Sequence, residues 1–217
     1  EWKGLTGSMR TAYWGFGPEA FPVQGRVWSP KPAGAFPLVL IVHGNHAMED
    51  PSDPGYAYLG ETLASQGFVV VSVDQNFINS SFSQMVNPFK LRDGEENDAR
   101  AWLLLEHLRV WRDWNADPAH PLHGRVDMSR IGLIGHSRGG EAVATAAGFN
   151  QLKAWPDDAS VTFDYGFDIR GVAAIAPVDG QYKPRRQPMP LRGVDYFVMH
   201  GSLDGDVTSF MGSTQYG

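Results

Sequence analysis

The sequence contains no cysteine, no long apolar run and no cluster of basic residues, and each absence excludes a class of protein. Without cysteine there is no disulfide, no thiolate metal ligand and no thiol nucleophile. No apolar run approaches the roughly 20 residues that a membrane-spanning helix needs. A net charge of −6 without clustered lysine or arginine argues against a nucleic-acid partner. We therefore expect a globular chain that acts on something other than nucleic acid.

Length and composition favour one α/β domain that covers residues 1–217. The chain has 217 residues, of which 42% are apolar and 19% charged, so it can bury one substantial core. The sequence begins at Glu1, and no signal peptide is visible in it. A processed chain would look the same, so the localisation stays open, and a secreted or periplasmic location is the one favoured.

Buried strands alternate with helices along the chain. Continuous apolar runs predict strands that are covered on both faces, at residues 37–43, 67–74, 130–134, 171–176 and 194–200. Helical patterns separate them, at residues 56–66, 93–114 and 141–149. Residues 11–18 and 23–30 are rich in aromatic and β-branched residues and predict two antiparallel edge strands. This order predicts a mostly parallel sheet flanked by helices.

Three longer stretches, at residues 75–92, 151–168 and 181–190, predict loops. Several aromatic residues lie in or near expected loops, where they either line an apolar acyl pocket or pack the core. These residues are Tyr13, Trp14, Phe16, Phe77, Phe82, Phe89 and Trp155.

The most informative stretch is the pattern Gly135-x-Ser137-x-Gly139. In a chain with 25 glycines the bare pattern is weak, and the alternative is an ordinary turn serine. Its context is stronger, because a short apolar strand precedes it and a run of small residues suited to a helix follows. A serine hydroxyl becomes a good nucleophile when a strained turn holds it beside a base and hydrogen-bond donors. The pattern therefore predicts a nucleophile elbow with Ser137 at its tip.

Two further motifs agree with the elbow: His43-Gly44-Asn45 after an apolar strand, and Gly201-x-x-Asp204-x-x-Val207 after another. Together the three resemble the α/β-hydrolase superfamily. The elbow is similar to that of chlorophyllases, platelet-activating-factor acetylhydrolases and dienelactone hydrolases. The resemblance covers most of the chain. It implies a serine carboxylesterase or lipase-like enzyme, with polyesters among its candidate substrates, that works through an acyl-enzyme and needs no metal or cofactor.

The resemblance and the chemistry together suggest roles for four residues. Ser137 attacks the ester carbonyl, and the main-chain N–H groups of Asn45 and Arg138 hold the oxyanion. Asp204 orients the catalytic imidazole and stabilises its cation, with Asp206 and Asp179 as alternatives. Since Asn45 would act through its main chain, changing its side chain should matter far less than changing Ser137.

Other candidate residues and other functions stay open at this point. We expect His43 and His136 to be structural rather than catalytic. The group His46, Glu49, Asp50 and Asp53 could ligate a cation, although a solvated loop explains it better. On the same fold, a peptidase, a lactonase or a non-catalytic binding module is the alternative to an esterase.

The sequence does not place a catalytic histidine where the superfamily has one. There the order is serine, acid, histidine, but no histidine follows His200 in this chain. Residues 207–217 look like the opening of a helix. We therefore expect the domain to be C-terminally incomplete. The final strand, helix and base would then come from a C-terminal continuation or a separate chain. The alternative is a site that uses His46 or His200 as its base.

Overall fold

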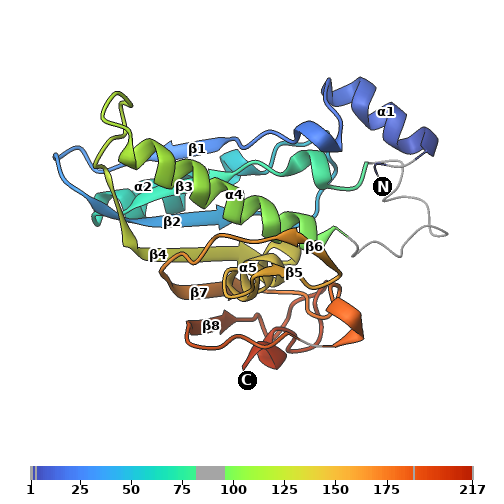
Figure 1. The fold of residues 1–217 in the computed structure, drawn as a ribbon. Helices are drawn as coiled ribbons and strands as arrows, with labels where there is room; N and C mark the ends of the chain where they lie inside the picture. The colour runs from blue at the N-terminus through green and yellow to red at the C-terminus, as the bar shows by residue number, and fades with distance from the viewer. Residues whose placement is uncertain (1, 3, 82–95, 188, 217) are drawn as a thin grey trace.

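The computed structural model describes residues 2, 4–81, 96–187 and 189–216. Its centre is a six-stranded sheet in the order β1-β3-β2-β4-β7-β8 (Figure 1). β1 runs antiparallel to β3, and every other neighbouring pair is parallel. The strands are β1 Gly25–Trp28, β2 Phe36–Val42, β3 Val69–Val73, β4 Val126–His136, β7 Ile169–Ile175 and β8 Asp195–Met199. This mostly parallel sheet is consistent with the α/β-hydrolase fold.

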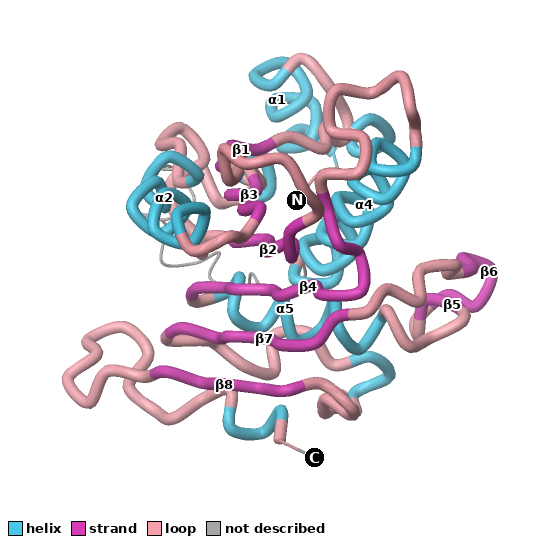
Figure 2. Tube along the Cα trace, turned by 90° about the vertical axis from the view of Figure 1, so that its left-hand side faces the viewer, coloured by secondary structure: helices cyan, strands magenta, loops and turns pink. Residues whose placement is uncertain are grey.

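Helices lie on both faces of the sheet, as Figure 2 shows. α4 Asn97–Ala116 and α5 Arg138–Phe149 pack on one face, and α2 Ala57–Ser65 packs on the other. Successive side chains of β2 point to opposite faces of the sheet. Leu38 and Leu40 lie in the larger core, while Val39 and Ile41 face α2. The continuous apolar runs of the sequence thus mark strands buried on both faces.

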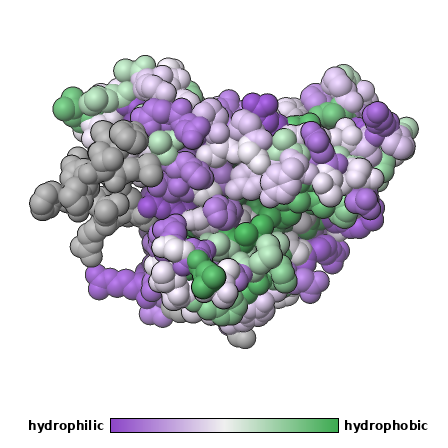
Figure 3. All heavy atoms as spheres, turned by 180° about the vertical axis from the view of Figure 1, so that it is seen from behind, coloured by the Kyte–Doolittle hydropathy of each residue, from purple (hydrophilic) through white to green (hydrophobic). Residues whose placement is uncertain are grey.

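The α2 face is less well covered towards β7 and β8. A hollow of about 340 Å³ opens there, with Leu63, Ile134, Ala173 and Phe197 in its lining. Phe197 and Met199 of β8 are 59% and 50% exposed. Figure 3 faces this side and shows a continuous hydrophobic surface in its lower half. Parallel sheets are ordinarily covered on both faces, so this surface is unusual for the fold.

The prediction of a strand at residues 11–18 is wrong. The N-terminal element is the helix α1 Gly4–Trp14. Its end packs Trp14 into an aromatic cluster with Phe16, Phe21 and Phe77. Burial of these rings outweighs the local β propensity of the segment, a common outcome when tertiary packing competes with propensity. The second predicted edge strand is confirmed as β1, at the antiparallel margin of the sheet.

Three other expectations change. Residues 151–168 contain a small antiparallel hairpin, β5 Ala154–Trp155 with β6 Asp158–Thr162. Residues 207–216 form no α-helix and only a short 3-10 turn at Ser213–Gln215. The described start of the predicted loop 75–92 is buried, and its residues Asn76–Ile78 form another 3-10 turn. Phe82, Phe89 and Asp93 lie outside the described residues.

Candidate active site

Ser137 lies between the end of β4 and the start of α5 with φ 55° and ψ −119°. A positive φ is strained for a residue with a side chain, so the surrounding packing must hold it. The glycines of the motif provide that packing. A Cβ on Gly135 would lie 2.1 Å from the carbonyl oxygen of Gly139, and a Cβ on Gly139 would lie 2.5 Å from that of His43. The chain thus forms the sharp strand-to-helix turn that the sequence predicts.

The loop after β2 lies directly against this turn. A Cβ on Gly44 would come within 2.8 Å of Ser137 Cβ, which places the His43-Gly44-Asn45 segment beside the serine. The main-chain N–H groups of Asn45 and Arg138 donate to no acceptor among the described residues. Two N–H groups without acceptors beside a serine are what an oxyanion hole requires.

The Asn45 side chain is bonded elsewhere. Its Oδ1 accepts a hydrogen bond from Ser80 N at 3.0 Å. The carbonyl of Ser80 accepts in turn from Met48 N at 2.9 Å. The loop after β2 is therefore attached at two points to Ser80, in the segment after β3.

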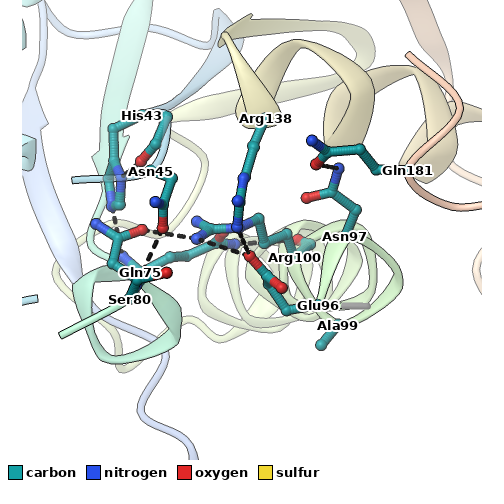
Figure 4. Close-up of polar contacts among 12 residues, drawn as sticks. His43, Asn45, Gln75, Ser80, Glu96, Asn97, Ala99, Arg100, Arg138 and Gln181 are labelled. Atoms are coloured by element: carbon teal, nitrogen blue, oxygen red, sulfur yellow. Dashed lines mark hydrogen bonds and ion pairs between the residues drawn. The ribbon is translucent and has the colours of Figure 1, made fainter. Parts of the chain in front are cut away.

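The side chain of Arg138 ties the elbow to α4. Its guanidinium forms a close ion pair with Glu96, the residue that precedes α4 (Figure 4). Glu96 Oε1 is also 4.0 Å from Arg100 Nη2 on the same helix. The Glu96 carboxylate thus lies between two guanidinium groups, one from the elbow and one from α4.

His43 is structural, as expected. Its Nε2 accepts from Gln75 N at 3.1 Å, and its Nδ1 donates to the carbonyl of Gly44 at 2.7 Å. Burial, and next the nearby charge of Arg100, lower the pKa of His43 to about 3. The ring therefore stays neutral at physiological pH and links the loop after β2 to the segment after β3.

His136 and His46 line one open hollow of about 450 Å³, together with Tyr56 and Tyr58. Burial and the neighbouring His46 lower the pKa of His136, while the carboxylates of the acid loop act in the opposite direction. His46, His136, the loop with Asp204 and Asp206, and the elbow therefore lie at the same edge of the sheet.

The three candidate acids differ in their surroundings. Asp204 Oδ1 accepts from the N–H groups of Asp206 and Val207, at 2.9 and 3.0 Å, and these bonds hold its pKa below the ordinary value. The Asp206 side chain belongs to an exposed residue. Asp179 Oδ1 accepts from Gln215 Nε2 at 2.8 Å. Asp204 is therefore kept ionised by its own loop, as an orienting acid must be.

None of these contacts places a histidine as the base of Ser137. In the described part of the chain, Ser137 Oγ has no hydrogen-bond partner, and no histidine is bonded to Ser137 or Asp204. His200 Nε2 donates to the carbonyl of Val207 at 2.7 Å. The other histidines lie on or near α4: His107 is buried, His120 stacks on Trp114 and His123 is exposed.

The aromatic residues divide between packing and lining. Trp14, Phe16 and Phe77 belong to one buried cluster, and Trp155 packs against the main core, so these rings support the packing alternative. A second hollow, of about 480 Å³, is lined by Tyr182, Met189, Phe210 and Met211, along with Asp179 and Glu141.

The proposed cation group does not assemble either. The Asp53 carboxylate accepts from Arg26 Nε at 2.8 Å. The described residues contain no set of three metal-ligating side chains. Nor do they contain a helix long and apolar enough to cross a membrane.

Sequence reasoning missed the buried segment from Gln75 to Ser80. The sequence carried no clear signal for it, because the amide side chains of Gln75, Asn76 and Asn79 are also common in exposed loops. Their partners lie far away in the sequence, so the pattern gave no means of pairing them.

Comparison with known proteins finds relatives of this sequence. The sequence model of the chlorophyllase family matches residues 18–193. A bis(hydroxyethyl) terephthalate hydrolase from Streptomyces coelicolor is 29% identical over 156 residues, which are 66% of this chain and 43% of that protein. Cutinase est1 from Thermobifida alba is 25% identical over 180 residues, 76% of this chain and 52% of the cutinase. Chlorophyllase type 0 from Chenopodium album is 29% identical over 130 residues, 58% of this chain and 39% of the enzyme. The chain thus spans about half the length of the curated relatives it matches.

Proposed function

The chain belongs to the chlorophyllase family, and from this membership we propose that it hydrolyses carboxylic esters through an acyl-enzyme on Ser137. The observation that carries the proposal is the elbow itself. A strained Ser137 lies against Gly44, beside two main-chain N–H groups that have no acceptor among the described residues. The named relatives are ester hydrolases, which agrees with this chemistry.

The proposed reaction has two stages. Ser137 Oγ attacks the carbonyl carbon as its proton passes to a histidine base, and the carbonyl oxygen takes the negative charge between Asn45 N–H and Arg138 N–H. The intermediate collapses, the alcohol leaves with the proton, and the acyl group stays on Ser137. Water then attacks with the help of the same base and releases the acid. Asp204 orients the base and stabilises its cation.

We propose that the base comes from outside residues 1–217, and that residues 1–217 are the larger part of one catalytic domain. His43 and His200 are bonded elsewhere, and no described histidine is bonded to Ser137 or Asp204. The exposed Phe197 and Met199 on β8 agree with a further strand and helix that complete the sheet. Ester turnover by residues 1–217, compared with a longer natural chain, tests this. Full turnover by the short chain, abolished by His46→Ala or His200→Ala, would contradict it.

We propose an ester with an apolar or aromatic part as the substrate, from a small molecule or a polymer. The hollow beside His136 presents Tyr56 and Tyr58, and the second hollow presents Tyr182 and Phe210. The relatives include a terephthalate ester hydrolase and a cutinase. A chain-length series of p-nitrophenyl esters tests the proposal, and activity on the acetate alone would exclude it.

The direct test of the function is Ser137→Ala in the natural protein. Turnover of p-nitrophenyl esters should fall to background while the circular dichroism spectrum stays unchanged. An esterase activity that survives this substitution would mean that Ser137 is not the nucleophile.

A further inference from the structure

The segment from Gln75 to Ser80, directly after β3, is buried to a degree unusual for a connection between elements. Asn79 and Phe77 are 0% exposed, and none of its six residues is more than 5% exposed. Buried main-chain groups must find partners, and here many of the partners are side chains from distant elements.

Two arginines from different helices hold this segment. Arg10 of α1 is 2% exposed, and its guanidinium donates to the carbonyls of Phe77 and Asn79 at 2.9 and 2.7 Å. Arg100 of α4 donates to Asn79 Oδ1 at 2.6 Å. Asn79 is therefore held through its main chain by one helix and through its side chain by another.

The next residue carries this constraint to the oxyanion loop. Ser80 N donates to Asn45 Oδ1, and Ser80 O accepts from Met48 N, three residues after Asn45 (Figure 4 shows the Asn45 and Ser80 pair). A shift of Asn79 would move Ser80 with it, and these two anchors of the loop are bonded to Ser80.

We infer that Arg10 is a positioning residue for the oxyanion hole, and that α1 serves as a brace for the loop after β2. A buried guanidinium is costly to desolvate, so bonding two carbonyls next to the loop gives it a purpose that an apolar side chain could not fulfil. The brace lies outside residues 18–193, the part that matches the family model, so it is a feature of this chain beyond that match. The inference rests on the proposed role of Asn45 N–H.

The expected effect of Arg10→Ala on kcat follows from the role proposed for the Asn45 N–H. Loss of one oxyanion donor costs about 10²- to 10³-fold in kcat, and a misplacement of about 1 Å can cost roughly 10²-fold. Arg10→Ala in the natural protein should loosen the donor without removing it. We expect kcat to fall by up to about tenfold with little change in KM, because Arg10 acts on the donor through Ser80 and Asn45.

The conservative variant and chemical rescue separate positioning from simple destabilisation. Arg10→Lys should retain part of the activity. Millimolar guanidinium should raise the kcat of Arg10→Ala and should not raise the kcat of the wild-type protein. Tyr13→Leu is the matched control, because it removes a ring that packs on Trp14 of the same helix and leaves the Arg10 bonds intact. It should lower the melting temperature and leave kcat unchanged below that temperature.

Amide hydrogen exchange provides a readout that does not depend on turnover. In Arg10→Ala the N–H groups of Ser80 and Met48 should exchange faster, while in Tyr13→Leu they should not. Wild-type kcat in Arg10→Ala would overturn the inference, and so would a lower kcat with unchanged exchange at Ser80. If the wild-type protein hydrolysed no ester, the proposed function would fail, and exchange alone would decide whether Arg10 holds the loop.

Discussion

Asn45 shows how one side chain changes the expected behaviour of a site. From the sequence, its side chain should be nearly dispensable because the main chain carries the chemistry. The structure bonds Asn45 Oδ1 to Ser80 N, so the side chain holds the loop that carries the proposed main-chain donor. A residue can thus act in catalysis through its main chain and still depend on its side chain.

The revised expectation can be measured at this residue. Asn45→Ala should lower kcat about tenfold, because it frees the loop without removing the N–H donor. Asn45→Asp retains the acceptor oxygen and should stay closer to wild type. Steady-state kinetics of both variants, beside Ser137→Ala, test this. An Asn45→Ala enzyme as inactive as Ser137→Ala, with its fold intact, would show that the loop has another role.

Among the elements, the strands were the easiest part to predict. β2 and β3 are continuous apolar runs, and such runs are visible locally because both faces of the strand are buried. The elbow was equally clear, since strand, motif and helix are contiguous. α1 was missed because its helix is stabilised by contacts with Phe77 and Asn79, which lie 67 and 69 residues from Arg10. No local pattern contains such contacts.

The elbow itself gives a prediction with a control on the same strand. Gly135→Ala should unfold or inactivate the protein, because its Cβ would lie 2.1 Å from the Gly139 carbonyl oxygen. Gly132→Ala, three residues earlier on β4, places its Cβ at an ordinary 3.6 Å from Val39 and should leave fold and turnover nearly unchanged. Thermal melts and ester turnover compare the two. Equal tolerance of both substitutions would contradict the close packing of the turn.

For the whole molecule, buried histidines make stability depend on pH. Burial lowers the pKa of His43 to about 3 and that of His107 to about 4, from an ordinary value of 6.5. The unfolded chain therefore binds protons that the folded chain does not bind as the pH falls below 6.5. The contribution of these two neutral rings to the free energy of unfolding should be complete above about pH 6.5. It should decrease as the pH falls towards 3.

Urea melts across this pH range test the effect, with His107→Leu as the informative variant. It should flatten the decrease between pH 6.5 and 4, because one of the two buried rings no longer titrates. The exposed His123 provides the control, and His123→Gln should keep the wild-type profile. An unchanged profile in His107→Leu would mean that this ring contributes nothing to acid sensitivity.

The central claim is that Ser137 is an activated nucleophile. Its most direct test is to treat the natural protein with a fluorophosphonate and locate the adduct by peptide mass spectrometry. We predict one adduct per chain, on Ser137, with loss of ester turnover in proportion to labelling. An adduct on another residue, or full ester turnover in unlabelled protein after prolonged treatment, would contradict the account.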